Sequence, residues 1–451
     1  MQKLFGTDGI RGRAGGKLTP ELALRASFGL ARIIATNKHR YRKKQRPVFT
    51  VAGDSRLSTT MLKSAVISGI TYGGCDVLDL GTVPTPLVPL IIISQGLAGG
   101  VMITASHNPV PDNGLKFFNH QGYKLDAADE AELERFVNKG ELPTLAQQNF
   151  GQSMEFDVSK FYLAFVRQAL GRSRPTRKLR VVLDCACGAT SELAPLVFWN
   201  LGFNVLQINS QFDGNRVNVN CGATNLKKLS QRVRQENADL GLAFDGDGDR
   251  VKAVDENGRE VSGDKIIALF ATKLSRYRQR KAAVMTHMTN MGVELALRDK
   301  GIRMVRTDVG DIKVLAAMKK HRLHLGGEQS GHIILRDKVP TGDGILVGTQ
   351  LAVLASRSKQ PLSKLVASFP EFPQQLTNLS VSDKEAWRRN RHLLNRLAAI
   401  EREYNDVRFY LRPSGTEDVV RVLTEAQDKA RCLKANAAVC SEFADWDKGR
   451  R

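Results

Sequence analysis

Three aspartates alternate with glycines in the segment LGLAFDGDGDRVKAVDENG. The small glycines leave room for the carboxylates of Asp245, Asp247 and Asp249 to converge on one hard divalent cation, and without a cation these carboxylates would repel one another. An EF-hand loop is the nearest alternative, because Glu256 falls at its twelfth position. However, Arg250 stands where that loop needs glycine, and both flanks resemble strands. The sequence therefore predicts a strand–loop–strand site for one Mg²⁺.

A serine stands at the end of a predicted buried strand, in the segment ITASHNPVPDNGLKFF. Open α/β folds bind ligands at the carboxyl edge of the sheet, where this places the hydroxyl of Ser106. A serine nucleophile needs an acceptor for its proton or a positive setting for its anion, and His107 and Lys116 offer these. Alternatively, Ser106 caps the next element and the pair Asn113 and Gly114 forms a hairpin turn. Taken alone, this segment supports both interpretations equally.

Two further glycine-containing loops carry groups that suit a phosphorylated sugar. In LRPSGTEDVVRV, hydroxyls and backbone N–H groups lie between two guanidinium groups, a combination that suits a phosphate dianion. In GGEQSGH, a carboxylate and a hydroxyl suit sugar hydroxyls or an amine, although a plain turn is the alternative for either loop. With the serine and the aspartates, these are the parts of a phosphoryl-transfer enzyme. The residues concerned are Arg412, Ser414, Gly415, Thr416 and Arg421 in the first loop, and Glu328, Ser330 and His332 in the second.

The elements that position these loops follow one plan in three places. The segments PVFTVAGDSRLS, LRVVLDCACGAT and KAAVMTHMTNMG each join a hydrophobic strand to a loop and then to a helical pattern. Such alternation predicts mixed or parallel sheets covered by helices. The C-terminal part has a charged helix and two short strands. We therefore predict three successive α/β domains and a smaller C-terminal α+β domain, with bounds at 1–152, 153–258, 259–370 and 371–451.

Length and composition are consistent with several soluble domains. A chain of 451 residues is too long for one compact core, and 42% of its residues are hydrophobic. No signal peptide is evident at the polar N-terminus, and the most apolar window contains proline and glycines, so it is a poor membrane span. The six cysteines form no CxxC pair. We expect free thiols and a cytoplasmic location.

The net charge of +21 is unusually positive. It suggests either a nucleic-acid surface, a field that steers anionic substrates, or solvated connectors between elements. The basic runs contain no interleaved aromatic residues apart from two tyrosines, and they match no nucleic-acid-binding motif. We expect solvated connectors that also attract anions, and no nucleic-acid partner. The runs lie at 38–46, 172–180, 276–281 and 388–392.

Five motifs occur in the order found in the α-D-phosphohexomutases: KLFGTDGIRG, TASHNP with NGLKFF, DGDGDR, GEQSGH and RPSGTE. The chain resembles that family from residue 3 to about residue 425, and FGTDGIRG and GEQSGH resemble the branch that acts on glucosamine phosphates. This resemblance implies four domains around a central cleft. It also implies an isomerase that interconverts glucosamine 6-phosphate and glucosamine 1-phosphate through glucosamine 1,6-bisphosphate. The product would serve UDP-N-acetylglucosamine and peptidoglycan precursor synthesis.

The resemblance further implies a role for each motif. Ser106 would be the phosphoserine, and its phosphate would join Asp245, Asp247 and Asp249 in holding Mg²⁺. Proton transfer and charge stabilisation would be served by Arg11, His107 and Lys116, and Arg250 would lie beside the metal site. The sugar would be bound by Glu328 and Ser330, with His332 nearby. The non-reacting phosphate would be bound by Arg412, Ser414, Gly415, Thr416 and Arg421.

Some positions depart from the family pattern, and some alternatives stay open. Ile312 stands where the family usually has arginine, Asp418 where proline is usual, and Cys187 where asparagine is common. A sibling enzyme for mannose or glucose phosphates is the second interpretation. A basic nucleic-acid-binding protein on a mutase scaffold is a distant third. The sequence leaves open whether two copies of the chain form a homodimer.

Overall fold

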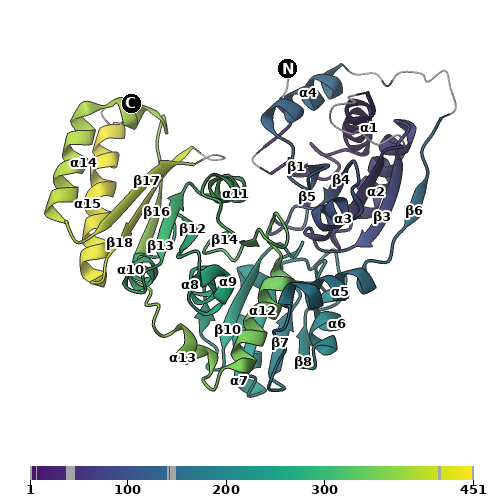
Figure 1. Cartoon of the computed structure of the whole chain (residues 1–451). Helices are drawn as coiled ribbons and strands as arrows, with labels where there is room; N and C mark the ends of the chain where they lie inside the picture. Colours follow the sequence, from purple (N-terminus) through teal and green to yellow (C-terminus); the bar gives the residue numbers. More distant parts are fainter. Residues whose placement is uncertain are drawn as a thin grey trace.

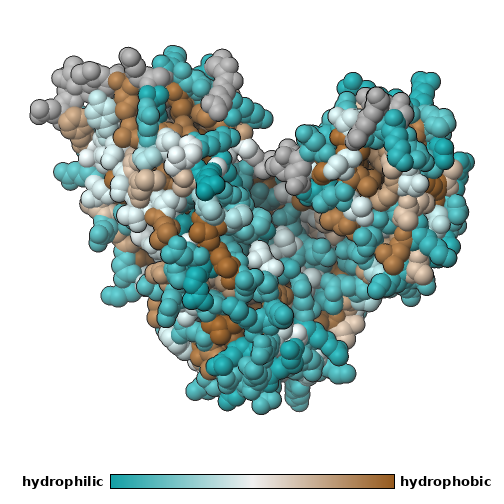
Figure 2. All heavy atoms as spheres, turned by 180° about the vertical axis from the view of Figure 1, so that it is seen from behind, coloured by the Kyte–Doolittle hydropathy of each residue, from teal (hydrophilic) through white to brown (hydrophobic). Residues whose placement is uncertain are grey.

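The computed structural model describes residues 3–6, 8–36, 46–139, 142, 149–414 and 418–448. Within these residues the strands form sheets of six, five, four and three strands. Figure 1 shows one unit around each sheet, with the N-terminal and C-terminal units facing each other across an open space. Seen from behind, the molecular surface is hollowed between these two units (Figure 2). The predicted fold class, three α/β domains and a smaller α+β domain around a central cleft, is confirmed.

The first unit places the serine segment between two neighbouring strands. Its sheet has the order β1-β5-β4-β2-β3-β6, in which β2, β3, β4 and β6 run parallel and β5 pairs antiparallel with both β4 and β1. Every residue of β4 is buried, as expected for an apolar strand covered on both faces. The elements are β1 (Ile10–Arg13), α1 (Pro20–Thr36), β2 (Val48–Gly53), α2 (Thr59–Tyr72), β3 (Asp76–Thr82), α3 (Leu87–Gln95), β4 (Gly99–Ile103), β5 (Asp112–Asn119), α4 (Ala127–Asn138) and β6 (Ser153–Glu155).

The second unit places the aspartate loop between two antiparallel strands. Its sheet has the order β11-β10-β9-β7-β8, with β9 parallel to β7 and antiparallel to β10. Phe244 pairs with Val251 at the last rung before the loop. The elements are α5 (Ser159–Leu170), β7 (Arg180–Asp184), α6 (Leu193–Asn200), β8 (Asn204–Ile208), the 3₁₀ helix η1 (Gly222–Thr224), α7 (Lys227–Gln235), β9 (Leu240–Phe244), β10 (Val251–Asp255) and β11 (Glu260–Val261).

The third and fourth units carry the loops predicted for the sugar and the phosphate. The third contains α8 (Gly263–Lys273), α9 (Ser275–Arg278), β12 (Ala282–Thr286), α10 (Met291–Asp299), β13 (Arg303–Thr307), α11 (Asp311–Lys320), β14 (Leu325–Gly327), β15 (Ile333–Leu335), α12 (Gly344–Arg357) and α13 (Leu362–Val366). The fourth contains β16 (Gln374–Ser380), the 3₁₀ helix η2 (Ala386–Arg389), α14 (Arg391–Glu403), β17 (Arg408–Pro413), β18 (Val419–Glu425) and α15 (Lys429–Lys448).

One large hydrophobic core ties the second and third units together. It includes side chains from α5, α6, α8 and α12 and extends to α3 of the first unit. The helix α12 packs on β9 and β10 of the second sheet, and the hydroxyl of Tyr162 on α5 donates to Asp343 Oδ1 at 2.7 Å. Removing this much apolar surface from water makes the two units a stiff base for the aspartate loop.

The predicted domain bounds stay predictions, and two structural observations bear on them. The strand β6 pairs with β3, so the first sheet continues just past the predicted bound at 152. The helix α12 lies inside the predicted third domain but covers the second sheet. No helix in the described ranges is long and apolar enough to cross a membrane. All six cysteines have free thiols.

Candidate active site

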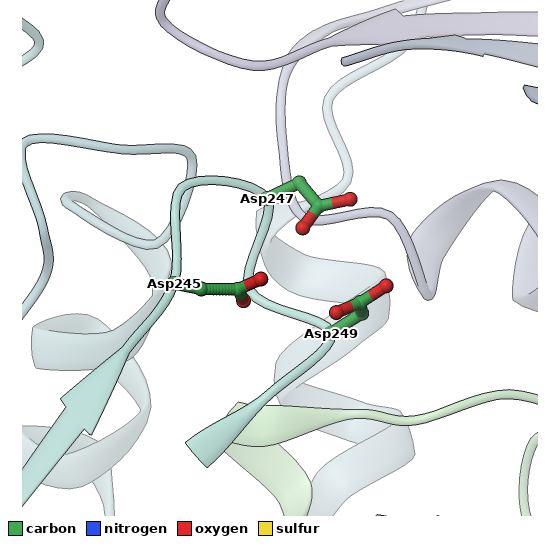
Figure 3. Close-up of side chains that lie close together, drawn as sticks. All are labelled: Asp245, Asp247 and Asp249. Carbon is green, nitrogen blue, oxygen red and sulfur yellow. The ribbon is translucent and has the colours of Figure 1, made fainter. Parts of the chain in front are cut away.

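The aspartate triplet lies on the turn that joins β9 to β10, as Figure 3 shows. The side chains of Asp245, Asp247 and Asp249 are buried, and one carboxylate oxygen from each lies within 4.8 Å of the others. The Oδ1 atom of Asp247 accepts no hydrogen bond, and that of Asp249 has a long contact of 3.5 Å with His332 Nδ1. Buried polar atoms are rarely left in this state, so the arrangement fits an oxygen-ligated divalent cation. Because strands flank the loop, the EF-hand alternative does not apply.

Two cations already face the three carboxylates. Lys116 Nζ lies 2.8 Å from Asp247 Oδ2 and 3.2 Å from Asp249 Oδ2, and Arg250 Nε lies 3.9 Å from Asp245 Oδ2. Burial, together with the charges of Asp249 and Asp247, raises the pKa of Asp245 well above its ordinary value. The carboxylates therefore need more positive charge than the chain supplies, and a divalent cation would provide it.

Ser106 reaches the aspartate loop from the first unit. Its Oγ donates to Asp245 Oδ2 at 2.7 Å and lies 3.3 Å from His107 Nδ1. The backbone of Ser106 has a φ of 52°, which is uncommon for a residue other than glycine and is found at functional turns. At Gly246 of the aspartate loop, a Cβ would lie 2.8 Å from the carbonyl oxygen of Ser106. Glycine therefore permits the close approach of the two loops.

Arg56 holds the serine loop in place, and the sequence analysis did not single it out. Its guanidinium is fully buried, and its Nε lies 3.0 Å from Asp54 Oδ2. The signal in the sequence was the order Asp-Ser-Arg after the buried strand β2, at the same sheet edge as Ser106. The guanidinium donates to backbone carbonyls of the serine loop, at 2.9 Å to Ser106, 2.8 Å to Asn108, 2.7 Å to Pro109 and 2.9 Å to Asp112.

The other predicted proton-transfer residues lie beside the serine. Arg11 forms an ion pair with Asp8, and its Nη1 lies 3.5 Å from Asn108 Oδ1. His107 is exposed, yet the surrounding protein and the guanidinium groups of Arg250 and Arg11 lower its pKa to about 4. Its imidazole is therefore neutral at neutral pH, so that Nδ1 can accept a hydrogen bond from the hydroxyl of Ser106.

The sugar-loop residues lie on the turn between β14 and β15 and differ in exposure. Glu328 and Ser330 are half-buried, and Glu328 Oε1 accepts the N–H of Gly310 at 2.9 Å. His332 is buried, and its Nε2 accepts the N–H of Gly342 at 3.1 Å. The ring proton then lies on Nδ1, which is 3.5 Å from Asp249 Oδ1. His332 thus ties the sugar loop to the aspartate loop.

The phosphate-loop residues lie on the fourth unit, apart from the groups around Ser106. In Figure 1 the adjoining ends of β17 and β18 point towards the space between the C-terminal and N-terminal units. Arg412 and Arg421 are direct cross-strand partners, and Arg421 Nη2 lies 3.4 Å from Ser414 Oγ. Burial and the charge of Arg421 lower the pKa of Arg412. A bound anion would offset this repulsion between the two guanidinium groups. Gly415 and Thr416 lie outside the described residues.

Two positions that depart from the family pattern lie at the surface. Asp418 is 91% exposed and forms an ion pair with Lys384 at 3.3 Å. Ile312 is 46% exposed, at the start of α11. Cys187 is buried, and its carbonyl oxygen accepts a hydrogen bond from Ser55 Oγ at 2.6 Å.

Comparison with known proteins places the whole chain in one family. Models described as phosphoglucomutase/phosphomannomutase match it in series: alpha/beta/alpha domain I at residues 2–144, domain II at 160–258, domain III at 262–372 and the C-terminal domain at 376–441. It is 40% identical to the phosphoglucosamine mutase of Methylobacterium nodulans over 433 residues, which cover 95% of this chain and 96% of that one. It is also 40% identical to the phosphoglucosamine mutase of Bacillus mycoides over 438 residues, covering 96% of each.

Solved structures show the same architecture. A phosphoglucomutase/phosphomannomutase family protein from Burkholderia thailandensis matches with a TM-score of 0.83 at 24% identity, covering 99% of this chain and 98% of that one. The N-acetylphosphoglucosamine mutase of Aspergillus fumigatus matches with a TM-score of 0.65 at 17% identity, covering 98% of this chain and 96% of that one. With four family models in series and relatives at 40% identity over nearly the whole length, the chain belongs to the phosphoglucomutase/phosphomannomutase family.

Proposed function

We propose that the chain interconverts glucosamine 6-phosphate and glucosamine 1-phosphate, with Ser106 as the carrier of the phosphoryl group. One observation carries this proposal. Ser106 Oγ lies 2.7 Å from Asp245 Oδ2, which joins a hydroxyl of the first unit to a metal-type carboxylate triplet of the second. The amino sugar is supported by the curated relatives at 40% identity, which are named phosphoglucosamine mutases.

The reaction begins with Ser106 phosphorylated. The phosphoserine gives its phosphoryl group to the free hydroxyl of the sugar phosphate, and glucosamine 1,6-bisphosphate forms. This intermediate reverses its orientation within the cleft and returns its other phosphoryl group to Ser106. The phosphate of the released sugar is then on the other position. A trace of sugar 1,6-bisphosphate therefore also serves as activator, because it phosphorylates Ser106.

The residues around Ser106 divide the chemistry among them. Asp245, Asp247 and Asp249 would hold Mg²⁺, which supplies charge stabilisation during transfer when it is bound. Although burial opposes it, the charges of Asp247, Asp8 and Asp249 raise the pKa of Lys116 well above its ordinary value. Lys116 therefore stays protonated and stabilises negative charge. We assign proton transfer to His107 on its position, because its Nδ1 lies 3.3 Å from Ser106 Oγ, and Arg11 adds positive charge near it.

The remaining groups hold the part of the substrate that does not react. Glu328 and Ser330 would bind the sugar hydroxyls and amine. The phosphate far from Ser106 would be bound by Arg412, Ser414, Gly415, Thr416 and Arg421. Two guanidinium groups on paired strands suit a phosphate dianion, which is the reason for this assignment.

The product is the 1-phosphate that a nucleotidyltransferase needs to make a UDP-activated amino sugar. We therefore assign the chain to UDP-N-acetylglucosamine and peptidoglycan precursor synthesis. A cytoplasmic location, a homodimer and the absence of a nucleic-acid partner stay predictions.

A coupled assay for glucosamine 1-phosphate tests the proposal. The reaction contains glucosamine 6-phosphate, Mg²⁺ and a trace of glucosamine 1,6-bisphosphate. We expect turnover by the wild type and none by Ser106→Ala. Ser27→Ala is the matched control, because Ser27 is equally buried in the same unit but lies on α1. Faster turnover of glucose or mannose phosphates than of glucosamine phosphate would favour the sibling enzyme. No turnover of any of these sugars by phosphorylated, metal-loaded wild type would refute the proposal.

A further inference from the structure

Lys124 joins the first and third units next to the candidate site. It follows β5, and its Nζ lies 2.6 Å from Asp311 Oδ2, at the first residue of α11. The same Nζ forms an ion pair with Asp8 of the N-terminal segment. The side chain of Lys124 is only 17% exposed, so both contacts are largely shielded from water. Lys124 therefore holds two carboxylates from distant parts of the chain.

Each of the two carboxylates, Asp8 and Asp311, is linked to residues of the candidate site. On the first unit, Asp8 forms an ion pair with Arg11 and lies 3.5 Å from Lys116 Nζ. On the third unit, Gly310 directly precedes Asp311 and donates its N–H to Glu328 Oε1 at 2.9 Å. Polar contacts, joined through the backbone between Asp311 and Gly310, thus link Arg11 and Lys116 to the carboxylate assigned to the sugar.

Among the residues that the structure describes, the helix α11 makes few other polar contacts with the first unit. It packs mainly on β12, β13 and β14 of its own sheet. Its second polar contact is Lys319, whose Nζ lies 3.1 Å from the ring centroid of Tyr123. Between the two contacts is a cavity of about 200 Å³, lined in part by Phe118, Leu315 and Ile334. The position of α11 against the first unit therefore depends strongly on Lys124.

We propose that Lys124 is a positioning residue for phosphoryl transfer. It holds Asp8, and through it the cations Arg11 and Lys116, at a fixed place relative to α11 and Glu328. The charged groups around Ser106 and the sugar-binding carboxylate then act as one site. The inference rests on the proposed function, because it assigns Lys124 a part in that same reaction.

Charge explains why one residue matters so much. Burial would raise the pKa of Asp8, but the charges of Lys116, Lys124 and Arg11 hold this pKa far below its ordinary value. Burial would likewise raise the pKa of Asp311, but the charge of Lys124 lowers it, so both carboxylates are ionised. Without Lys124, the half-buried carboxylates of Asp8 and Asp311 would lose the cation that both contact, and their repulsion would weaken the contact of α11 with the first unit.

Steady-state kinetics of Lys124→Met test the proposal. Because a displacement of about 1 Å can cost up to about a hundredfold in rate, we expect kcat/KM to fall by about tenfold to a hundredfold. We expect KM for glucosamine 6-phosphate to rise along with a fall in kcat, since Glu328 and the cations lose their mutual placement. Lys124→Arg keeps the charge and should restore most of the loss. Lys63→Met is the matched control, because Lys63 is 21% exposed and pairs with Asp79 at 2.8 Å within the first unit alone.

A double-variant comparison separates this role from general damage. If the contact with Asp311 is what matters, Asp311→Asn in the Lys124→Met background should add little further loss. Losses that multiply, or a Lys124→Met enzyme with wild-type kcat and KM, would overturn the proposal. All variants should keep the wild-type thermal midpoint to within a few degrees, which would show that they fold.

Hydrogen exchange gives a readout that does not depend on the proposed reaction. Lys124→Met should speed exchange of the Gly310 amide and the first turn of α11, whereas Lys63→Met should leave it unchanged. If the wild type turns over no glucosamine phosphate but this difference is seen, the proposed function is wrong, while the role of Lys124 in positioning α11 is supported. If exchange is unchanged in Lys124→Met, Lys124 does not position α11, whatever the activity of the variant.

Discussion

Replacing Arg56 by methionine should destabilise the first unit and disorder the serine loop. Methionine keeps much of the volume but removes the guanidinium, which pairs with Asp54 and donates to the carbonyl oxygens of Ser106 and Asn108. All of these contacts lie in the interior of the site. Arg56→Met therefore removes the cation paired with the buried Asp54, to which the hydroxyls of Thr59 and Thr104 still donate, and deprives several carbonyl oxygens of the guanidinium.

The size of the effect follows from the burial of the pair. Both side chains are 0% exposed, and breaking a fully buried ion pair by removing one partner costs about 3–5 kcal/mol. The carbonyl oxygens add to this, but loop movement and water would relieve part of their cost. A loss of this size in a domain of roughly 150 residues lowers the thermal midpoint by on the order of 10 °C. We also expect at least about a tenfold loss of kcat/KM, because Ser106 is no longer held.

The loss should depend on pH. Burial raises the pKa of Asp54 even in the wild type, where Arg56 opposes the rise. In Arg56→Met this opposition is gone, so the folded-state pKa rises further above its unfolded value. A carboxyl of this kind binds more protons in the folded state, and its contribution to stability is lost as pH rises. The gap between the variant and the wild type should therefore be smaller at pH 5 than at pH 8.

Thermal unfolding at both pH values, followed by circular dichroism, measures these effects. Arg46→Met is the control, because Arg46 pairs with Asp76 at 3.2 Å in the same unit but is 34% exposed. Partly exposed pairs contribute less than about 1 kcal/mol. A double variant, Arg56→Met with Asp54→Asn, should recover part of the stability. If Arg56→Met costs no more than Arg46→Met, or if its deficit grows at low pH, the reasoning is refuted.

Three further predictions concern the metal site and the joint between units. Lys116→Met removes a cation that competes with Mg²⁺ for Asp247, so calorimetry should show tighter Mg²⁺ binding. The kcat should fall by about a hundredfold or more, because the positive charge of Lys116 is lost. Weaker Mg²⁺ binding would contradict this prediction. Asp247→Asn should weaken Mg²⁺ binding in the same titration, and chelation should abolish wild-type turnover reversibly; turnover that survives chelation would argue against a metal. Tyr162→Phe deprives the buried Asp343 of its hydroxyl donor and leaves it the N–H of Leu346; this change should cost about 1.5–3 kcal/mol in thermal unfolding, without changing Mg²⁺ affinity.

The parts of the fold and site that sequence could predict lie next to strongly apolar strands. β4 and β9 are buried along their whole lengths, so their composition shows where they end and hence where Ser106 and Asp245 begin their loops. By contrast, the strand β6 is short, exposed and polar, and nothing in its pattern indicates that it pairs with β3.

The parts that sequence could not predict depend on contacts between distant segments. Arg56 acts on backbone carbonyls, which leave no trace in the residue types of the serine loop. Lys124 and Asp311 are 187 positions apart, and neither stands in a pattern that points to the other. His332 was expected near the sugar, but its contact with Asp249 arises only when the second and third units pack together. Such pairings follow from tertiary packing and become visible only in the folded chain.

The most direct test of the central claim is the mass of the peptide that contains Ser106. Wild-type protein is treated with phosphatase, then incubated with glucosamine 1,6-bisphosphate and Mg²⁺ and digested. We predict that this peptide gains one phosphoryl group on Ser106 and loses it again when excess glucosamine 6-phosphate is added. If Ser106 stays unmodified, or if its phosphate is not transferred to the sugar, Ser106 is not the carrier and the proposed mechanism is wrong.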